Sequence, residues 1–429
     1  MKMENKNKIS QVVKDNLCTG CGTCYAMCPK EAISMKINER KGIYEPVIDE
    51  SKCNNCGICY EVCPGHAVDF EQLNLEIFGK EPEDILIGNY LNCYIGYSTD
   101  YDIRYNSSSG GLVTQLLIFA LEEGIIDGAL VTRMKKDKPL EPEPFIARTR
   151  EEVIEASKTK YCPVPANVAL RKVLEANEKE RFAVVGLPCH IHGVRKAEQI
   201  NKILKERIVL HLGLFCLANI SFLGTNFIFR QFNINTEDID RISYRGNGWP
   251  GGMKVIFKDG GVRFLRTEEY YNEFFASFKI YRCLLCHDHT NELADISFGD
   301  AWHEKDRDNV GLSVVISRND KAEKFLKTAR NKAIKLKEIK VEEIKKSQDY
   351  MAFKKRDLNA RITLMKFLGK KIPSYNIDLP KSPINAYLNS ICSYIDNFLI
   401  NHNLLKILKW EVRLRTRIIS LRNPRGNKS

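Results

Sequence analysis

The sequence predicts a multidomain protein of the α+β and α/β classes, because three regions of the 429-residue chain carry different patterns. Two runs of closely spaced cysteines lie between residues 18 and 63, and helical and extended patterns alternate from about 107 to 345. Past residue 347 the extended patterns fade and lysine-rich helical segments follow. We therefore expect a small cysteine-rich module, a mixed α/β domain and a helical C-terminal tail.

The two cysteine runs share one spacing, with gaps of two, two and three residues and a proline after the last cysteine. The runs are Cys18, Cys21, Cys24 and Cys28, and Cys53, Cys56, Cys59 and Cys63. This spacing is typical of a bacterial-type ferredoxin module with two [4Fe-4S] clusters, in which the fourth cysteine of each run ligates the other cluster. We therefore expect one cluster on the first three cysteines of run one with Cys63, and a second on the first three of run two with Cys28.

Zinc and disulfides are the alternatives to iron–sulfur clusters. Zinc requires only four thiolates and does not call for a three-residue gap followed by proline. Residues 1–16 are polar and contain no apolar signal-peptide core, and a reducing compartment disfavours disulfides. The sequence contains no run of 18 apolar residues that could span a membrane. We therefore expect a cytoplasmic protein whose cysteines are metal ligands or free thiols.

The formal net charge of +12 is concentrated near the C-terminus. Residues 400–429 contain eight lysines and arginines against Glu411 alone. Apolar residues recur at helical spacing in 404–422 beside a basic face, as in helices that lie on an anionic membrane surface. A helix packed on its own domain is the alternative to this peripheral contact with the inner face of the membrane. No recognition motif accompanies the charge, so nucleic acid is not expected as a partner.

The pattern of glycines, prolines and hydrophobic periodicity divides the chain. Gly79, Pro82 and Gly88 indicate a linker at 71–100 after a ferredoxin domain at 9–70. Helices are expected at 112–123, 166–177 and 321–333, strands at 127–133, 182–185, 208–215, 295–298 and 312–317, and a hairpin at 255–265. The mixed domain is expected to have an N-terminal part at 101–173 and a C-terminal part at 174–345, followed by a basic helical tail at 346–429.

Four further cysteines are spread along the mixed domain. They are Cys189, Cys216, Cys283 and Cys286. The first two follow predicted strands and the last two form a C-x-x-C pair, so together they can supply four thiolates to a third [4Fe-4S] cluster. Alternatively, the first two are small buried hydrophobic residues and the pair binds zinc with His287 or His289.

Five short motifs of the chain occur in the same order as in a known protein family. They are YNSSSGG at 105–111, GLPC at 186–189, FC at 215–216, the C-x-x-C pair at 283–286 and SFGDAW at 297–302. In this order they resemble the family of coenzyme F420 hydrogenase/dehydrogenase β subunits over roughly residues 10–345. The resemblance implies an oxidoreductase in which a flavin-containing α/β domain exchanges a hydride with the 5-deazaflavin coenzyme F420. It also implies that the four further cysteines ligate a cluster of that domain.

The resemblance places FAD in the first part of the mixed domain. The proposed loop consists of Ser107, Ser108, Ser109, Gly110 and Gly111, and it opens into the helix predicted from residue 112. Its amides and hydroxyls can face a pyrophosphate, whose charge the helix dipole favours. A plain serine N-cap is the alternative.

Three further residues are candidates for the flavin ring and ribose. Lys160 and Tyr161 lie in a segment similar to the family's Ser-Lys-Tyr, where the lysine would stabilise the anionic reduced ring and is the catalytic candidate. An exposed loop lysine is the alternative. Asp300 would fix a ribose or a ring nitrogen, or else cap a helix.

The predicted function follows from these parts. A flavin accepts a hydride and releases single electrons, so we expect hydride exchange with coenzyme F420 or another small-molecule hydride carrier, and electron transfer through three clusters to or from a redox partner protein. His190 stands where the family has glutamine, and Cys162 begins a departure after Tyr161. Two alternatives therefore stay open. One is a relative that reduces another substrate in a bacterial biosynthetic pathway, for example for polysaccharide, and the other is an electron-relay subunit without a substrate site. The Asn-, Ile- and Lys-rich composition suits an anaerobe.

Overall fold

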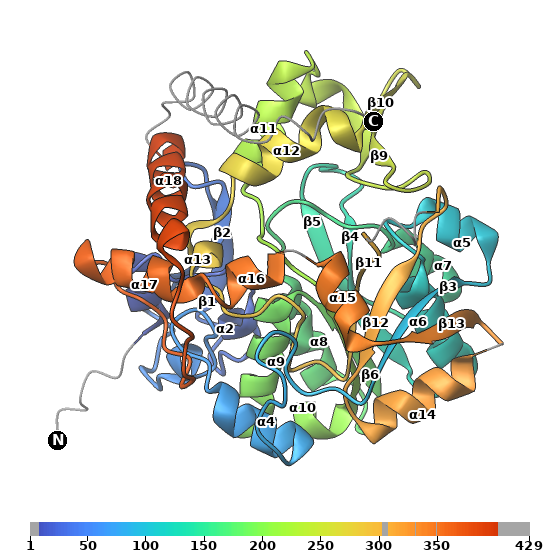
Figure 1. The fold of residues 1–429 in the computed structure, drawn as a ribbon, viewed down its shortest axis with the longest axis horizontal. Coiled ribbons are helices and arrows are strands. Elements are labelled where there is room, and N and C mark those ends of the chain that lie inside the picture. Colours follow the sequence, from blue (N-terminus) through green and yellow to red (C-terminus); the bar gives the residue numbers. More distant parts are fainter. Residues whose placement is uncertain (1–7, 303–307, 331, 349, 402–429) are drawn as a thin grey trace.

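The computed structural model describes residues 8–302, 308–330, 332–348 and 350–401. An eight-stranded mixed sheet forms the centre of the molecule, in the order β13-β3-β12-β11-β7-β6-β4-β5 (Figure 1). The strands are β3 (Asn92–Ser98), β4 (Gly128–Met134), β5 (Pro142–Ala147), β6 (Phe182–Gly186), β7 (Ile208–Leu214), β11 (Ile296–Asp300), β12 (Ser313–Ser317) and β13 (Ile334–Ile339). Strands β4, β6, β7 and β11 are parallel, and antiparallel strands complete both edges.

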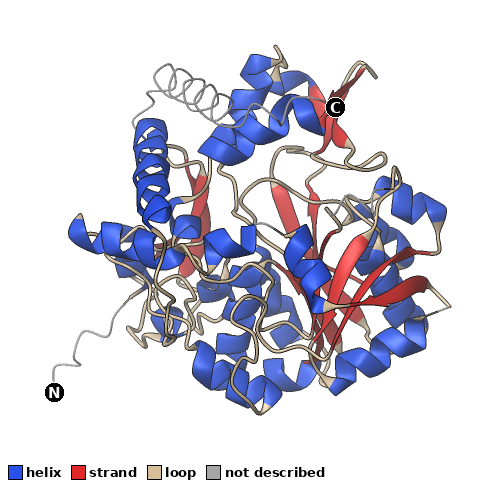
Figure 2. Cartoon of the chain, in the orientation of Figure 1, coloured by secondary structure: helices blue, strands red, loops and turns tan. Residues whose placement is uncertain are grey.

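Helices cover both faces of this sheet, as Figure 2 shows. They are α5 (Tyr101–Asn106), α6 (Leu112–Glu122), α7 (Arg150–Glu155), α8 (Leu170–Glu175), α9 (Pro188–Ile200), α10 (Lys202–Arg207) and α14 (Asp320–Ala329). Alternate residues of β6 point to opposite sides: Phe182 and Val184 join the hydrophobic core that contains α9, whereas Ala183 joins the core that contains α6. Strands buried on both faces explain the near-continuous apolar runs of the central segments.

The ferredoxin module packs against one side of this domain (blue in Figure 1). It contains α1 (Ile9–Lys14), α2 (Thr23–Ala26), α3 (Ile58–Glu61) and the antiparallel hairpin β1 (Ile33–Asn38) and β2 (Ile43–Ile48). Gly22 and Gly57 hold equivalent positions before α2 and α3 and have φ of 86° and 82°. Glycine adopts this left-handed conformation without strain, which lets each cysteine loop turn directly into its helix.

A second, smaller unit is inserted between β7 and β11. It consists of the antiparallel sheet β8 (Ile239–Ser243), β9 (Gly252–Phe257) and β10 (Val262–Arg266) with α11 (Phe222–Gln231), α12 (Thr267–Ser277), α13 (Tyr281–Leu284) and a 3-10 turn at Thr236–Asp238. This sheet, with α11 and α12, lies at the top of Figure 1. The predicted hairpin at 255–265 corresponds to β9 and β10.

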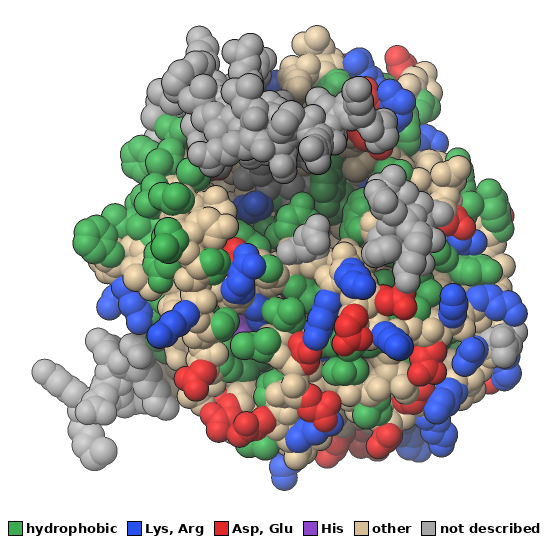
Figure 3. Space-filling model, viewed as in Figure 1, with side chains coloured by type: hydrophobic (Ala, Val, Ile, Leu, Met, Phe, Trp, Pro, Cys, Tyr) green, Lys and Arg blue, Asp and Glu red, His purple; other side chains and the backbone are tan. Residues whose placement is uncertain are grey.

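The chain after β13 is helical in its described part. It forms α15 (Val341–Ser347), α16 (Tyr350–Lys354), α17 (Leu358–Phe367) and α18 (Ile384–Asn401). Between the last two helices it returns to the ferredoxin module, where the amide of Val68 donates to the carbonyl oxygen of Ser374 at 2.9 Å. Apolar side chains gather over α17 and α18 in Figure 3, among them Phe367, Ile384 and Leu388. The membrane-contact prediction for 404–422 lies outside the described residues, and no helix in the described part is long and apolar enough to cross a bilayer.

The largest departure from the sequence-based expectation is the segment at 71–100. Instead of a linker, it contains most of α4 (Phe70–Phe78) and the whole of β3. Strand β3 pairs with both β12 and β13, strands more than 200 residues later in the chain. This segment becomes an inner strand only through pairing with these distant partners. The glycines and the proline of 71–100 therefore led to the prediction of a linker. The helix predicted at 166–177 is split into a 3-10 turn at Ala166–Ala169 and α8.

Candidate redox site

The eight cysteines of the ferredoxin module separate into two groups. Burial raises the pKa of Cys18, and the nearby Cys63 and Cys21 thiols raise it further. Burial likewise raises the pKa of Cys59, to which the thiols of Cys56, Cys28 and Cys53 add. The fourth cysteine of each run therefore lies among the first three of the other run. Repulsion between neighbouring thiolates disfavours their ionisation, and the positive charge of bound iron offsets that repulsion.

Backbone amides point at several of these sulfurs. The amides of Gly20, Gly65 and Ala32 donate to the sulfurs of Cys18, Cys63 and Cys28, each at 3.3 Å. Such donors stabilise sulfur-centred negative charge and tune a cluster's potential. The two groups differ in exposure: the cysteines grouped with Cys18 are all buried, whereas those grouped with Cys59 are half-buried. The second group is therefore nearer to the surface.

The four further cysteines also converge, although they come from three parts of the chain. Cys189 lies in the first turn of α9, Cys216 follows β7, and Cys283 and Cys286 lie in and after α13. Burial raises the pKa of Cys189 well above its usual value, and the thiols of Cys21, Cys283, Cys216 and Cys286 raise it further. The amide of Asn219 donates to the sulfur of Cys283 at 3.3 Å.

The histidines of this region do not complete a zinc site. The ring nitrogens of His287 lie 3.1 and 3.2 Å from Nζ of Lys355, and Nε2 of His289 lies 3.3 Å from Gln348. In the described part of the chain, no three Cys, His, Asp or Glu side chains converge as they would around a single metal ion. In a four-iron cluster each cysteine binds a different iron, so its four ligands need not meet at one ion.

The buried ferredoxin group is braced against the four further cysteines. The amide of Asn167 donates to the carbonyl oxygen of Cys21 at 2.9 Å, and its side chain donates to Thr23 Oγ1 at 2.8 Å. Gly193 of α9 lies so close that an added Cβ would be 2.2 Å from Thr23 Oγ1. Lys196, one turn along α9, donates to the carbonyl oxygen of Cys63 at 3.0 Å. The ferredoxin module is therefore fixed on the helix that carries Cys189.

A large cavity lies at the C-terminal ends of β6, β7 and β11, with a volume of about 650 Å³. This volume is in the range that holds organic cofactors. The cavity brings together almost all of the predicted flavin residues, namely Ser107, Ser108, Ser109, Gly111, Lys160, Tyr161 and Asp300, and also Cys216. The same cavity thus borders the predicted phosphate loop and one of the four further cysteines.

The predicted phosphate loop is itself well hydrogen-bonded. The hydroxyls of Ser107 and Ser109 donate to the carbonyl oxygens of Ile103 and Leu312, each at 2.7 Å, and the amide of Gly110 donates to Ser313 Oγ at 2.9 Å. Gly110 does not line the cavity; a Cβ there would lie 2.6 Å from the carbonyl oxygen of Gly96.

Two other parts of this loop remain directed at the cavity. The hydroxyl oxygen of Ser108 accepts from the amide of Thr159 at 2.8 Å, which leaves its proton available. The first turn of α6, at 112–114, also lines the cavity and contains no acidic residue. Ser108 and the start of α6, rather than Gly110, are the groups that can meet a phosphate.

Lys160 lines the cavity with the other predicted flavin residues, and its ammonium is bound by the backbone. Its ammonium donates to the carbonyl oxygens of Ala156, Ser157 and Lys158 at 2.5, 2.7 and 3.0 Å, just beyond the C-terminal end of α7. Burial lowers its pKa to about 7, opposed by the Cys162 thiol. Its donors are thus directed at the chain that precedes it, and it holds together this part of the cavity wall.

Arg245, which the sequence motifs do not mark, holds the opposite wall. Its Nη1 donates to Asp300 Oδ2 at 2.5 Å and to the Tyr161 hydroxyl at 3.3 Å, and its Nε donates to the carbonyl oxygen of Pro250 at 3.1 Å. Burial opposes its charge, but Asp300 and Tyr161 outweigh burial and raise its pKa. Asp300 therefore forms an ion pair with Arg245 at the end of β11.

Two buried polar atoms in the cavity wall have no hydrogen-bond partner among the described residues. They are Nη2 of Arg245 and Nδ1 of His289. Burial lowers the pKa of His289 to about 4, so its ring is neutral at physiological pH. Unpaired buried polar atoms are costly, and a ligand with hydrogen-bonding groups would satisfy them. Together with aromatic side chains such as Tyr271 and Trp302, they fit a flat, oxygen- and nitrogen-bearing ring such as a flavin.

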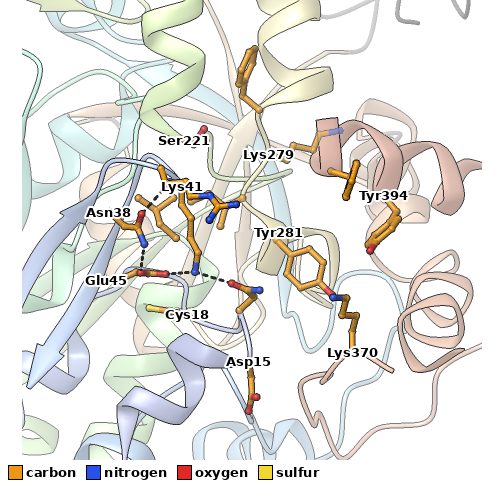
Figure 4. A pocket seen from close by; sticks show the side chains of 16 residues that line it. Asp15, Cys18, Asn38, Lys41, Glu45, Ser221, Lys279, Tyr281, Lys370 and Tyr394 are labelled. Carbon is orange, nitrogen blue, oxygen red and sulfur yellow. Dashed lines mark hydrogen bonds and ion pairs between the residues drawn. The ribbon is translucent and has the colours of Figure 1, made fainter. Parts of the chain in front are cut away.

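A second cavity, of about 440 Å³, adjoins Cys18 (Figure 4). It lies between the β1–β2 hairpin, α13 and α18. Lys41 donates there to Glu45 and to Asn16, each at 2.8 Å. Its wall reaches the buried ferredoxin group and is separate from the predicted flavin residues.

Comparison with known families decides the affiliation of this fold. The model "4Fe-4S dicluster domain" matches residues 17–67, and the two models "Coenzyme F420 hydrogenase/dehydrogenase, beta subunit" match residues 93–171 (N-term) and 179–346 (C terminus). The chain belongs to this family of β subunits. Its N-terminal part is a 4Fe-4S domain, and the family is one of electron-transferring oxidoreductases. The match beginning at 93 includes β3, in agreement with its place in the sheet.

Individual relatives agree with this membership. The coenzyme F420 hydrogenase subunit beta of Methanothermobacter thermautotrophicus is 29% identical over 67% of this chain and 100% of its own length. A subunit of the F(420)H(2) dehydrogenase of Methanosarcina mazei is 27% identical over 69% of this chain and 80% of its own. The coenzyme F420-dependent sulfite reductase of Methanocaldococcus jannaschii is 27% identical over 79% of this chain but only 49% of its own.

A solved structure shares the fold. It is a chain of the F420-reducing [NiFe] hydrogenase complex from Methanosarcina barkeri, with a TM-score of 0.52 and 24% identity over 68% of this chain and 98% of that chain.

Proposed function

We propose that this member of the family is an iron–sulfur flavoprotein. It exchanges a hydride between coenzyme F420 and FAD, and passes single electrons through three [4Fe-4S] clusters to or from a partner protein. The observation that carries this proposal is the cavity of about 650 Å³, which borders both the Ser108 loop and Cys216. A flavin is the cofactor that joins two-electron and one-electron chemistry, so a flavin site beside a cluster site suits this role.

The third cluster is assigned to the four cysteines of the mixed domain, with Cys189 on the side nearest to the ferredoxin module. Cys21 is among the thiols that interact with Cys189, which supports the buried ferredoxin cluster as the next in sequence. The half-buried group around Cys59 would hold the outermost cluster. Electrons would therefore pass between the cavity and the surface through an inner, a buried and an outer cluster.

The chain's own residues prepare the flavin site in three ways. Ser108 and the first turn of α6 would hold the pyrophosphate. Lys160 fixes the segment that ends in Tyr161 by holding three carbonyl oxygens. The aromatic side chains of Tyr161 and Tyr271 line the cavity and offer apolar surface against which the ring would pack.

Coenzyme F420 as the hydride carrier is supported by the relatives, whose names describe hydrogenase, dehydrogenase and sulfite reductase proteins that use it. Two of these are named as subunits, which supports the proposal that this chain also has a protein partner. The cavity favours this proposal over a relay subunit without a substrate site.

The test is anaerobic stopped-flow reduction of the purified full chain. Reduced coenzyme F420 should bleach a bound flavin first and the iron–sulfur absorbance afterwards. NADH and NADPH should be poor donors, because the G-x-G-x-x-G match at 246–251 leads from strand β8 into strand β9 and not into a helix, as a dinucleotide-binding fingerprint requires. Flavin-free protein that still passes electrons from a donor to the clusters would refute the flavin proposal. Rapid reduction by NADPH but not by reduced F420 would instead favour another substrate.

Cluster number is tested by iron analysis with a matched control. The full chain should contain about 12 iron atoms, four for each set of four cysteines. Cys189→Ser should lose about four of them. Cys93→Ser, which changes a buried cysteine of β3 outside the three groups, should lose none. Unchanged iron in Cys189→Ser would contradict the third cluster.

A further inference from the structure

Arg245 presents an unused hydrogen-bond donor to the large cavity. Its side chain is 4% exposed, and two of its three nitrogens are bonded to Pro250, Asp300 and Tyr161. The third, Nη2, has no partner in the described part of the chain, although the residue lines the cavity. A guanidinium is planar, so the three existing bonds also fix the direction of Nη2.

The charges around Arg245 define the ligand that it can accept. The Asp300 carboxylate pairs with it, Lys158 and Glu268 also line the cavity, and the Trp302 ring lies 5.4 Å from the guanidinium carbon. Because Asp300 already balances its charge, Arg245 is suited to a carbonyl oxygen with partial charge more than to a separate phosphate. Tyr161, Tyr271 and Trp302 line the same cavity and would suit a planar ring beside this donor.

We propose that Nη2 of Arg245 donates to the pyrimidinedione edge of the redox ring bound in this cavity and stabilises its reduced, anionic form. This inference rests on the proposed function. Flavins and 5-deazaflavins share that edge, so the same chemistry applies to FAD and to coenzyme F420. Arg245 thereby takes the role that the sequence analysis gives to Lys160, whose ammonium is directed at three backbone carbonyl oxygens.

Removing Arg245 and removing Asp300 should shift the flavin midpoint potential in opposite directions. Reduction adds negative charge at the ring edge, which Arg245 attracts and Asp300 repels. Arg245→Gln should therefore lower the ratio of reduced to oxidised flavin at a given potential about tenfold, which equals a fall of about 30 mV in the two-electron midpoint potential. Asp300→Asn should shift the midpoint potential in the opposite direction, because it leaves the arginine unbalanced.

The experiment is anaerobic spectroelectrochemistry of the FAD-loaded full chain, with coenzyme F420 affinity measured in parallel by deazaflavin fluorescence. Arg245→Gln leaves the half-buried Asp300 carboxylate without its partner. The double variant Arg245→Gln/Asp300→Asn therefore serves as the version in which both side chains are neutral. Arg241→Gln is the matched control, since this arginine lies on β8 with its side chain 76% exposed. Circular dichroism and iron content report on folding.

The outcomes show which ring Arg245 contacts, and they separate a failure of this inference from a failure of the proposed function. A lowered flavin potential in Arg245→Gln assigns the edge to FAD, and weakened coenzyme F420 binding with an unchanged flavin potential assigns it to the deazaflavin; both support the inference. Wild-type protein that binds a ring, with folded Arg245 variants unchanged in both measurements, overturns the inference alone. Wild-type protein that binds neither ring overturns the proposed function as well.

Discussion

The guanidinium of Arg282 donates to the carbonyl oxygen of Gly65 at 2.6 Å. Arg282 immediately precedes Cys283, and Gly65 follows the Cys63–Pro64 step of the ferredoxin module, so this one contact joins two cysteine groups. A second bond, from the same side chain to the carbonyl oxygen of Pro64 at 3.2 Å, adds to it. Arg282 is 3% exposed, and its fixed position keeps the two groups at a constant separation.

Arg282→Ala should loosen this junction. Hydrogen bonds from a buried charged group each contribute about 1.5–3 kcal/mol, so the local opening free energy of residues 60–68 should fall by about 3 kcal/mol. Hydrogen exchange measured by mass spectrometry reports this opening directly. Transfer of electrons from flavin to the ferredoxin clusters should slow in the same variant. Arg241→Ala on the exposed face of β8 is the control, and equal exchange in the two variants would contradict the bracing role.

Gly110 and Ser108 should respond differently to substitution by alanine. A Cβ at position 110 would lie 2.6 Å from the carbonyl oxygen of Gly96 and 2.9 Å from the amide nitrogen of Ser313, so Gly110→Ala should destabilise the sheet whether or not flavin is present. Ser108→Ala removes a hydroxyl from the cavity wall and the hydrogen bond that it accepts from the Thr159 amide, so it should weaken FAD binding while lowering the melting temperature of the flavin-free protein less than Gly110→Ala does. Thermal unfolding and flavin affinity separate the two effects. A melting temperature unchanged by Gly110→Ala would mean that this backbone approach is not tight.

The parts of the fold that can be predicted from the sequence are those determined by the spacing of residues close together in the chain. The cysteine runs required only the sequence, because two-residue gaps and a following proline define a loop around a cluster. The strand predicted at 182–185 coincides with β6, since a parallel strand buried on both faces is a short apolar run. Strand β3 has a similar burial, but its pairing with β12 and β13 depends on residues 313–339. No local pattern in 71–100 contains that information.

The site was predictable by position but not by role. Ser108, Lys160 and Asp300 all reach one cavity, as the motif order implies. The direction in which each side chain points depends on tertiary contacts, however. The Lys160 ammonium is held by carbonyl oxygens at the end of α7, and the Asp300 carboxylate is held by Arg245. Arg245 lies in no recognised motif. The sole available signal was a single arginine just before a glycine-rich turn at 246–252, which is too weak to mark a ligand contact.

Lys160 should make the opening of α7 depend on pH. Its pKa is lowered from 10.5 to about 7 by burial, so between these values the opened segment binds more protons than the folded one. The opening free energy should therefore rise with pH from about 7 to 10.5, by up to about 1.4 kcal/mol per pH unit. Hydrogen exchange of residues 150–156 at pH 7, 8 and 9, corrected for intrinsic rates, measures this slope.

Lys160→Met should remove that slope, because methionine keeps much of the side-chain volume without a titrating group. Lys138→Met is the control, since this lysine has its side chain 61% exposed and lies outside the segment that holds the Lys160 ammonium. Parallel pH profiles for wild type and Lys160→Met would show that the lysine is charged throughout this range. In that case the carbonyl oxygens, and not burial, determine its protonation.

The outermost ferredoxin group should control exchange with an external partner. Its cysteines are half-buried, whereas those around Cys18 are buried, so the outer cluster is the one that a partner can approach. Cys56→Ser should disrupt that cluster. Reduced coenzyme F420 should then still reduce the flavin and the inner clusters, but steady-state transfer to an artificial one-electron acceptor such as methyl viologen should fall at least tenfold. Cys392→Ser, on α18, changes a half-buried cysteine outside the three groups and should retain the full rate. If Cys56→Ser also kept the full rate, electrons would leave from a different site, and the cavity beside Cys18 would be the next position to test.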